Sequence, residues 1–278
     1  MTALGKQLRL SRLFDQASQT SIIIPMDHGI EDPNYPQLED PRKLVADLAR
    51  AGVNAFLMRR GLARFTAESF AGRAGWVQRM TGRTGLAHDD ADQLLLASVE
   101  EAARSGADAI VPTVFLGGQT EKAHLPLIGQ LGDEAGKYGI PLLVEVFPTG
   151  DSNAHPYDGP YTVADMRVAV RAASEEGADF IKTWYTGDPK TFSQVVAYST
   201  VPVLIAGGPK ARDERQVLEM VKGAMDGGAR GIAMGRKIWQ SANPVGVVEA
   251  LKRIIRHGAS VDEAMDAIKT PVLAGAAR

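Results

Sequence analysis

The sequence predicts an α/β protein, a single-domain (β/α)8 TIM barrel. Eight strand-length apolar runs alternate with helical patterns, and runs that are apolar throughout are typical of a parallel sheet covered by helices. The length of 278 residues suits one such barrel. An open doubly wound sheet is the rival fold. It is disfavoured because the first run is followed by D-H-G-I-E-D-P-N-Y-P, a Pro-rich loop, rather than by the phosphate-binding G-x-G-x-x-G.

A recurring phrase marks the points where a helix ends and a strand begins. In each copy a glycine can take the left-handed conformation that closes a helix, after which a short apolar run resumes as extended chain. The four copies are A-R-A-G-V-N-A-F-L (49–57), A-R-S-G-A-D-A-I-V (103–111), S-E-E-G-A-D-F-I-K (174–182) and M-D-G-G-A-R-G-I-A (225–233).

The alternation fixes the order of the predicted strands. In chain order they are 21–27, 55–61, a weak run near 84–86, 108–117, 141–148, 179–185, 202–208 and 231–236. No linker-like segment divides the chain. We therefore expect residues 1–278 to form one barrel, with an N-terminal helical extension and a loose C-terminal tail.

Composition narrows the classes of partner. The formal net charge is −2 and the Lys and Arg residues are scattered, so no basic face indicates nucleic acid or an acidic membrane. The chain has no cysteine and no signal-peptide or membrane-spanning run, which favours the cytoplasm. The histidines show no ligand-like spacing, so we expect no metal and no other cofactor. The expected partner is a small molecule.

Lys182 is a cation inside the predicted strand D-F-I-K-T-W-Y. A structural interpretation has its stem packed on apolar neighbours while its ammonium reaches the rim or a carboxylate. Flanked by Phe180, Ile181 and Trp184, however, the amine would be poorly hydrated, and desolvation lowers the pKa of a lysine and makes it nucleophilic toward carbonyls. The residue therefore indicates Schiff-base chemistry.

Other polar residues follow the predicted strands, where barrel enzymes carry their chemistry. Asp27 and His28 end the first strand, and Asp27 is either a cap of the following loop or a carboxylate that handles protons beside an iminium. The last two strands end in glycine-bearing turns, which are ordinary tight turns or a phosphate site built from backbone N–H groups and one arginine. The candidate phosphate-binding residues are Gly207, Gly208, Gly235 and Arg236.

Five segments in this order resemble the archaeal-type class I aldolase family over nearly the whole chain. They are G-K-Q-L-R-L-S-R-L-F, P-M-D-H-G, F-I-K-T-W-Y-T-G-D, I-A-G-G-P-K and G-I-A-M-G-R-K-I-W-Q. The family includes fructose-bisphosphate aldolase, 2-amino-3,7-dideoxy-D-threo-hept-6-ulosonate synthase and an autoinducer-2 thiolase. The resemblance implies that Lys182 forms the Schiff base, that Asp27 is its acid/base partner and that the four glycine-turn residues hold the substrate phosphate. It also implies a homo-oligomer, a pentamer or decamer.

The chain departs from the family in one segment. Where the aldolase and heptulosonate synthase branches carry Tyr-Pro-Arg-Gly, with the tyrosine as proton donor, this chain has F-P-T-G, beginning at Phe147. A phenylalanine donates no proton. Either another group substitutes, or the reaction differs at that step, as in the thiolase branch. The candidate substitutes are His28, Tyr185, His155 and Tyr157.

These observations predict a class I Schiff-base aldolase, an aldehyde-lyase that cleaves or forms a carbon–carbon bond in a phosphorylated ketose. Fructose 1,6-bisphosphate or a similar dihydroxyacetone-phosphate aldol is the expected substrate. A transaldolase-type heptulosonate synthase and a thiolase acting on a phosphorylated dione are the alternatives within the family. A barrel that binds a sugar phosphate without catalysis is the alternative of another class.

Overall fold

The computed structural model describes residues 4–87, 93–149, 161–208 and 213–269. Nine parallel strands form the main sheet, in the order β6-β3-β2-β1-β11-β10-β9-β8-β7. Their bounds are β1 Ser21–Pro25, β2 Ala55–Met58, β3 Gly75–Arg79, β6 Ala109–Val111, β7 Thr113–Leu116, β8 Leu143–Pro148, β9 Phe180–Thr183, β10 Val203–Ala206 and β11 Gly231–Ala233. A separate antiparallel pair joins β4 (Thr81–Gly82) to β5 (Leu94–Leu95).

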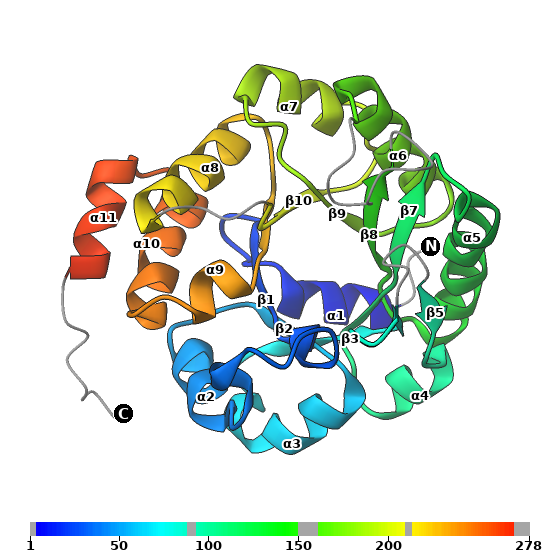
Figure 1. Cartoon of the computed structure of the whole chain (residues 1–278), viewed down its shortest axis with the longest axis horizontal. Helices are drawn as coiled ribbons and strands as arrows, with labels where there is room; N and C mark the ends of the chain where they lie inside the picture. The colour runs from blue at the N-terminus through cyan, green and yellow to red at the C-terminus, as the bar shows by residue number, and fades with distance from the viewer. Residues whose placement is uncertain (1–3, 88–92, 150–160, 209–212, 270–278) are drawn as a thin grey trace.

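The sheet closes into a barrel through Pro112. Strands β6 and β7 are the two ends of the strand order, yet only this proline separates them in the chain. Proline has no N–H to donate, so it interrupts the ladder of hydrogen bonds. Strand β6 pairs with β3, and β7 pairs with β8. Together they occupy one position, so the nine strands make a barrel of eight positions. Figure 1 shows the barrel end-on.

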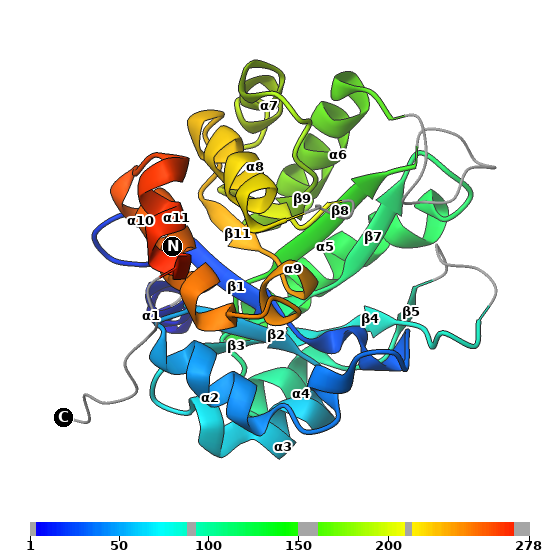
Figure 2. The same ribbon diagram turned by 60° about the vertical axis from the view of Figure 1, so that its left-hand side comes forward.

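Helices surround the barrel (Figures 1 and 2). Their bounds are α1 Leu4–Leu13, α2 Arg42–Arg50, α3 Arg60–Phe70, α4 Val99–Arg104, α5 Glu121–Tyr138, α6 Val163–Glu175, α7 Pro189–Val196, α8 Glu214–Asp226, α9 Arg236–Trp239, α10 Pro244–His257 and α11 Val261–Lys269, with 3-10 helices η1 Asp27–Ile30 and η2 Pro36–Leu38. No helix in the described ranges is both long enough and apolar enough to cross a membrane.

The helix-closing glycines behave as predicted. Gly52, Gly106, Gly177 and Gly228 have φ values of 86°, 88°, 106° and 96°. A side chain rarely adopts this conformation, so each glycine lets the chain turn sharply from a helix into the next strand.

The third strand was predicted at the wrong place. Residues 84–86 lie beyond the barrel, and the strand that fills this position is β3, with the sequence G-W-V-Q-R. It pairs with β2 on one side and with β6 on the other. Its last residue is a buried arginine, Arg79, whose charge hid the strand from a search for apolar runs. The count of eight was right, and one of the eight was misplaced.

The barrel interior is apolar at the amino ends of the strands and is closed there by α1. The inward-facing cluster includes Leu13 from α1 and one or two residues from every barrel strand except β7. Phe14 packs edge-on against Phe180 of β9, with ring centroids 5.4 Å apart. Lys6 pairs with Asp179 at 2.9 Å, and Arg12 with Asp108 at 2.6 Å. Helix α1, the predicted N-terminal extension, thus covers the amino ends of the strands and forms what we call the floor of the barrel. The expected loose tail, 270–278, lies outside the described residues.

Candidate active site

Strand register brings three polar side chains to one level of the barrel. Thr113 of β7 is the Cα partner of Glu145 on β8, and Glu145 is the partner of Lys182 on β9. In parallel strands, paired residues point to the same face, so all three side chains enter the interior. They lie one layer above the apolar cluster, toward the carboxyl ends of the strands, where this fold carries its chemistry.

Lys182 is buried, with 6 % of its surface exposed, and its Nζ forms an ion pair with Oε1 of Glu145. The other carboxylate oxygen of Glu145 accepts from Thr113 Oγ1 at 2.9 Å and lies 2.6 Å from Arg79 Nη1. Both oxygens of Glu145 are therefore held, and only Oε1 faces the lysine.

Arg79 joins this pair to Asp27. Its Nε donates to Asp27 Oδ2 at 2.5 Å, and both residues are buried. Asp27, Arg79, Glu145 and Lys182 thus form a chain of alternating charges with no net charge, which we call the ion-pair network. A buried charge is tolerated only when it is paired in this way.

The network sets the protonation of its carboxyl groups. Burial raises the pKa of Asp27, but Arg79, followed by weaker contributions from His28, Arg59 and Lys182, outweighs it and lowers the pKa well below the usual range. Burial likewise raises the pKa of Glu145, and Arg79 with Lys182 reverses the shift. Both carboxyl groups are therefore ionised at neutral pH.

His28 stands beside Asp27 without a hydrogen bond to it. Its Nδ1 is 3.7 Å from Asp27 Oδ1, and both atoms are buried and lack a hydrogen-bond partner in the described part of the chain. The His28 ring contacts Tyr35 and Trp239, with centroids 6.3 and 6.0 Å away. Trp239 is fixed in turn, because its Nε1 donates to Pro25 O at 3.0 Å. Two polar atoms at the barrel mouth thus remain available to a ligand.

Burial lowers the pKa of His28 from 6.5 to about 4; Asp27 opposes this shift, and the nearby cations add to it. In the unfolded chain His28 therefore binds a proton near pH 6.5, whereas in the folded protein it binds one only near pH 4. Stability should fall as pH decreases through this window, by roughly 3 kcal/mol from this residue. Urea unfolding at several pH values measures it. A non-titrating His28→Gln variant should show a shallower slope, and an equal slope would contradict the assignment.

Four aromatic side chains, which we call the aromatic wall, pack together above Glu145 and Lys182: Phe115, Phe147, Tyr161 and Trp184. Phe147 stacks on Trp184 with centroids 4.2 Å apart, and Trp184 stacks on Tyr161 at 4.5 Å. Phe115 flanks Phe147 at 5.9 Å, as their strand register requires. Phe147, at the position where the resemblance implies a tyrosine, is thus packed within apolar rings, and this side of the mouth is hydrophobic.

The predicted phosphate-binding residues follow β10 and β11, the two strands next to β9 in the barrel order. Gly207 and Gly208 follow β10, and Gly235 and Arg236 follow β11. A Cβ on Gly235 would lie 2.1 Å from Pro25 O, so only glycine fits there. Arg236 is exposed and its Nη1 is 3.5 Å from the Tyr35 hydroxyl. Arg236 thus lies beside Tyr35, whose ring contacts His28.

Tyr185 does not join the other predicted residues. Tyr185 lies two residues past the end of β9, and its side chain points outward, toward α7 and α8. A Cβ on Gly223 of α8 would meet its hydroxyl, and its ring contacts Phe192 of α7 at 5.3 Å. The structure brings Asp27, His28 and Lys182 together and leaves Tyr185 between two helices. His155 and Tyr157 lie outside the described residues.

Sequence reasoning gave no role to Arg79, Thr113 or Glu145. A signal for Glu145 was present, since a carboxylate inside an apolar run is as unusual in a buried strand as the lysine at position 182. No local signal distinguishes Thr113.

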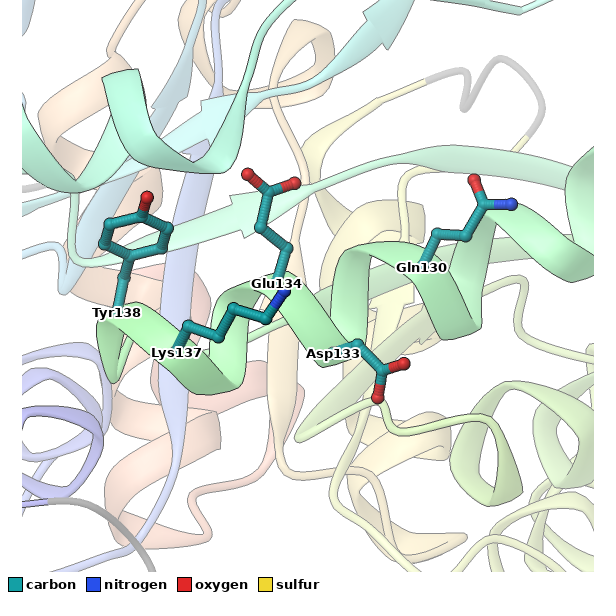
Figure 3. Close-up of a pocket in the computed structure, with 5 residues that line it drawn as sticks. All are labelled: Gln130, Asp133, Glu134, Lys137 and Tyr138. Carbon is teal, nitrogen blue, oxygen red and sulfur yellow. The ribbon is translucent and has the colours of Figure 1, made fainter.

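Two hollows on the surface contain no member of the ion-pair network. One, of about 350 Å³, lies on α5 and is lined by Gln130, Asp133, Glu134, Lys137 and Tyr138 (Figure 3). The other, of about 800 Å³, runs beside α3 to the amino ends of β3 and β6. Among the described residues, no group of three or more acidic or histidine side chains is placed to hold a metal ion.

Comparison with known proteins places the chain in a family. The model of the DeoC/LacD family aldolases matches residues 21–241. This chain belongs to the DeoC/LacD family of aldolases. The aldolase is 32% identical to 2-amino-4,5-dihydroxy-6-oxo-7-(phosphonooxy)heptanoate synthase of Streptomyces griseus, over 91% of each chain. It is 32% identical to 2-amino-3,7-dideoxy-D-threo-hept-6-ulosonate synthase of Halobacterium salinarum, over 95% of this chain and 97% of the other.

A solved structure agrees with both the barrel and the family. It is that of an archaeal fructose-1,6-bisphosphate aldolase with its catalytic lysine covalently bound to the carbinolamine intermediate of the substrate. The two folds superpose with a TM-score of 0.79 at 32% identity, over 90% of this aldolase and 99% of that chain. The predicted barrel and the predicted family are confirmed.

Proposed function

We propose that this aldolase acts on a phosphorylated ketose through a Schiff base on Lys182, with fructose 1,6-bisphosphate or a similar dihydroxyacetone-phosphate aldol as substrate. The observation that carries the proposal is the position of Lys182, buried at the carboxyl end of β9 with its Nζ against a carboxylate. The amine condenses with the ketone carbonyl and water leaves. The resulting iminium accepts the electron pair when the adjacent carbon–carbon bond breaks.

Asp27 handles the proton of the carbon–carbon step. Its Oδ2 is fixed by Arg79, while its buried Oδ1 has no hydrogen-bond partner among the described residues. A carboxylate oxygen in that state accepts the proton of the substrate hydroxyl as the aldol bond breaks. His28, neutral at physiological pH, offers Nδ1 beside it for a substrate hydroxyl.

The substrate phosphate is held by Gly207, Gly208, Gly235 and Arg236. Backbone N–H groups and a guanidinium are the donors that phosphate binding uses. An Arg236→Met variant should raise KM for phosphorylated substrates roughly 10- to 100-fold, the worth of one charge-assisted hydrogen bond, and leave kcat nearly unchanged. Steady-state kinetics with a phosphorylated and an unphosphorylated ketose check this. Equal effects on both substrates would contradict the assignment.

Transfer of a carbon unit to an acceptor aldehyde is the second candidate function, as in the heptulosonate synthases to which the chain is similar. It is favoured by the 32% identity to two such synthases, each over at least 91% of this chain. Phe147 does not separate transfer from cleavage, because the resemblance implies a tyrosine at that position in both branches. Supplying a second aldehyde together with fructose 1,6-bisphosphate distinguishes the two. A new ketose product indicates transfer, and release of both triose phosphates indicates cleavage.

Borohydride trapping tests the Schiff base itself. The protein is incubated with dihydroxyacetone phosphate, reduced and digested, and the peptides are weighed by mass spectrometry. The expected result is one adduct, on the peptide that contains Lys182. An adduct on another lysine, or none with any phosphorylated ketose, would leave the barrel as a sugar-phosphate binder without catalysis.

We further propose that the aldolase is a cytoplasmic homo-oligomer, a pentamer or decamer, and that residues 1–278 act as one domain. The resemblance to the archaeal-type class I aldolases supports the assembly. Native mass spectrometry tests it, and a monomer at micromolar concentration would contradict it.

A further inference from the structure

Glu145 is the carboxylate that touches the proposed nucleophile. Its Oε1 forms an ion pair with Lys182 Nζ, whereas Asp27 contacts Arg79 instead. Glu145 is nearly inaccessible, with 6 % of its surface exposed. A solvent molecule therefore has little access to this contact, and a proton that leaves the lysine has a carboxylate oxygen directly beside it.

The next inward side chain of β8, one layer above Glu145, cannot take part in this proton transfer. Phe147 is the next inward residue of the strand, and it packs on Trp184 at 4.2 Å and near Phe115 at 5.9 Å. Its ring carries no exchangeable proton. The ionisable group that β8 does offer to Lys182 lies two residues earlier, at Glu145, on the same face of the strand.

We propose that Glu145 is a catalytic acid/base that moves the protons of imine formation. This inference rests on the proposed function and deepens it. Glu145 takes a proton from the Lys182 ammonium, and the neutral amine attacks the ketone carbon. Glu145 returns the proton to the carbonyl oxygen as the C–N bond forms. It then takes the second nitrogen proton and delivers it to the carbinolamine hydroxyl, which leaves as water.

The charges of Glu145 and of the lysine nitrogen are the same before and after imine formation. Before it, Glu145 is a carboxylate opposite an ammonium, and after it, the same carboxylate stands opposite an iminium. Arg79 and Thr113 hold Oε2 throughout, at 2.6 and 2.9 Å, so Oε1 is fixed where the nitrogen reacts. The roles of the two carboxylates then separate. Glu145 serves the steps at nitrogen, and Asp27 serves the carbon–carbon bond.

A Glu145→Gln variant tests the role, since it keeps the size of the side chain and removes the proton acceptor. The enzyme is mixed with dihydroxyacetone phosphate, quenched with borohydride at successive times and assayed for the Lys182 adduct. The expected rate of adduct formation falls roughly 10²- to 10⁴-fold, the usual worth of general acid–base catalysis. The matched control is Glu249→Gln, which removes a carboxylate paired with Lys252 on α10, 2.9 Å away. It should form the adduct at the wild-type rate.

Asp27→Asn supplies the contrast. It should form the adduct nearly as fast as the wild type yet fail to cleave fructose 1,6-bisphosphate. Glu145→Asp covers the case in which Glu145→Gln does not fold, judged by circular dichroism. It keeps the charge and withdraws the carboxylate from Lys182 by one methylene, so adduct formation should slow roughly tenfold or more.

The possible outcomes separate the two proposals. If the wild type forms no adduct on Lys182 with any phosphorylated ketose, the proposed function and this inference fall together. If the wild type forms the adduct and a folded Glu145→Gln or Glu145→Asp protein forms it equally fast, the role of Glu145 alone is overturned. Slow adduct formation in the Glu145 variants, with normal formation in Asp27→Asn, supports it.

Discussion

Replacing Lys182 with Met should abolish carbon–carbon bond cleavage, with kcat falling on the order of 10⁶-fold, as it does when a covalent nucleophile is removed. Methionine keeps most of the side chain's volume and provides no nitrogen to form an iminium. Because the iminium is the electron sink, no other group of the network replaces it. The release of triose phosphate from fructose 1,6-bisphosphate, followed in a coupled assay, measures the loss.

Lys190→Met is the matched control for this variant. Lys190 is an exposed residue of α7, eight positions further along the chain, and no network residue contacts it. Its loss should leave kcat and KM unchanged. Residual activity in Lys182→Met within tenfold of the wild type would mean that cleavage does not pass through this amine.

Replacing Arg79 with Met should lower the free energy of unfolding by about 3–5 kcal/mol, the cost of removing one member from a buried ion pair. Asp27 and Glu145 would then face each other's charge without the cation between them. Burial would raise the pKa of both carboxyl groups, so the variant would bind protons that its unfolded chain does not bind. The loss should therefore be larger at about pH 8 than at about pH 5.

Guanidinium unfolding at the two pH values checks the prediction. Arg215→Met is the control, because Arg215 pairs with Asp262 at 2.6 Å on the exposed surface, where water screens the charges. Its midpoint should not move measurably. A loss under about 1 kcal/mol in Arg79→Met, or one independent of pH, would show that the network does not depend on Arg79 for its stability.

The sequence predicts the barrel well because its signals are local. A glycine that closes a helix and an apolar run that follows it lie within ten residues of one another, and the copies ending in β2, β6, β9 and β11 were all placed correctly. Strand β3 was missed for the opposite reason. The charge of Arg79 is acceptable in a strand only because Asp27 and Glu145, from distant parts of the chain, meet it in the folded barrel.

The candidate site was predictable where the side chain is unusual for its position. Lys182 stood out inside a predicted strand and Asp27 at the end of one, and the structure brings them into one network. The direction of a side chain at the end of a strand was harder to foresee. Tyr185 lies one residue past Trp184, and this single step sends its hydroxyl outward, to α8. Thr113 carries no local signal, since its role follows only from its register with Glu145.

The floor formed by α1 has a consequence for the order of folding. This helix precedes its partners in the chain by many residues: Arg9 donates to Ala107 O and Gly139 O, and Phe14, just past the helix, packs on Phe180. Contacts so far apart in sequence close large loops and form slowly. During synthesis the contacts around α1 therefore stay incomplete until β9 emerges. The level that holds Lys182, directly above Phe180, is completed only when α1 closes the barrel beneath it.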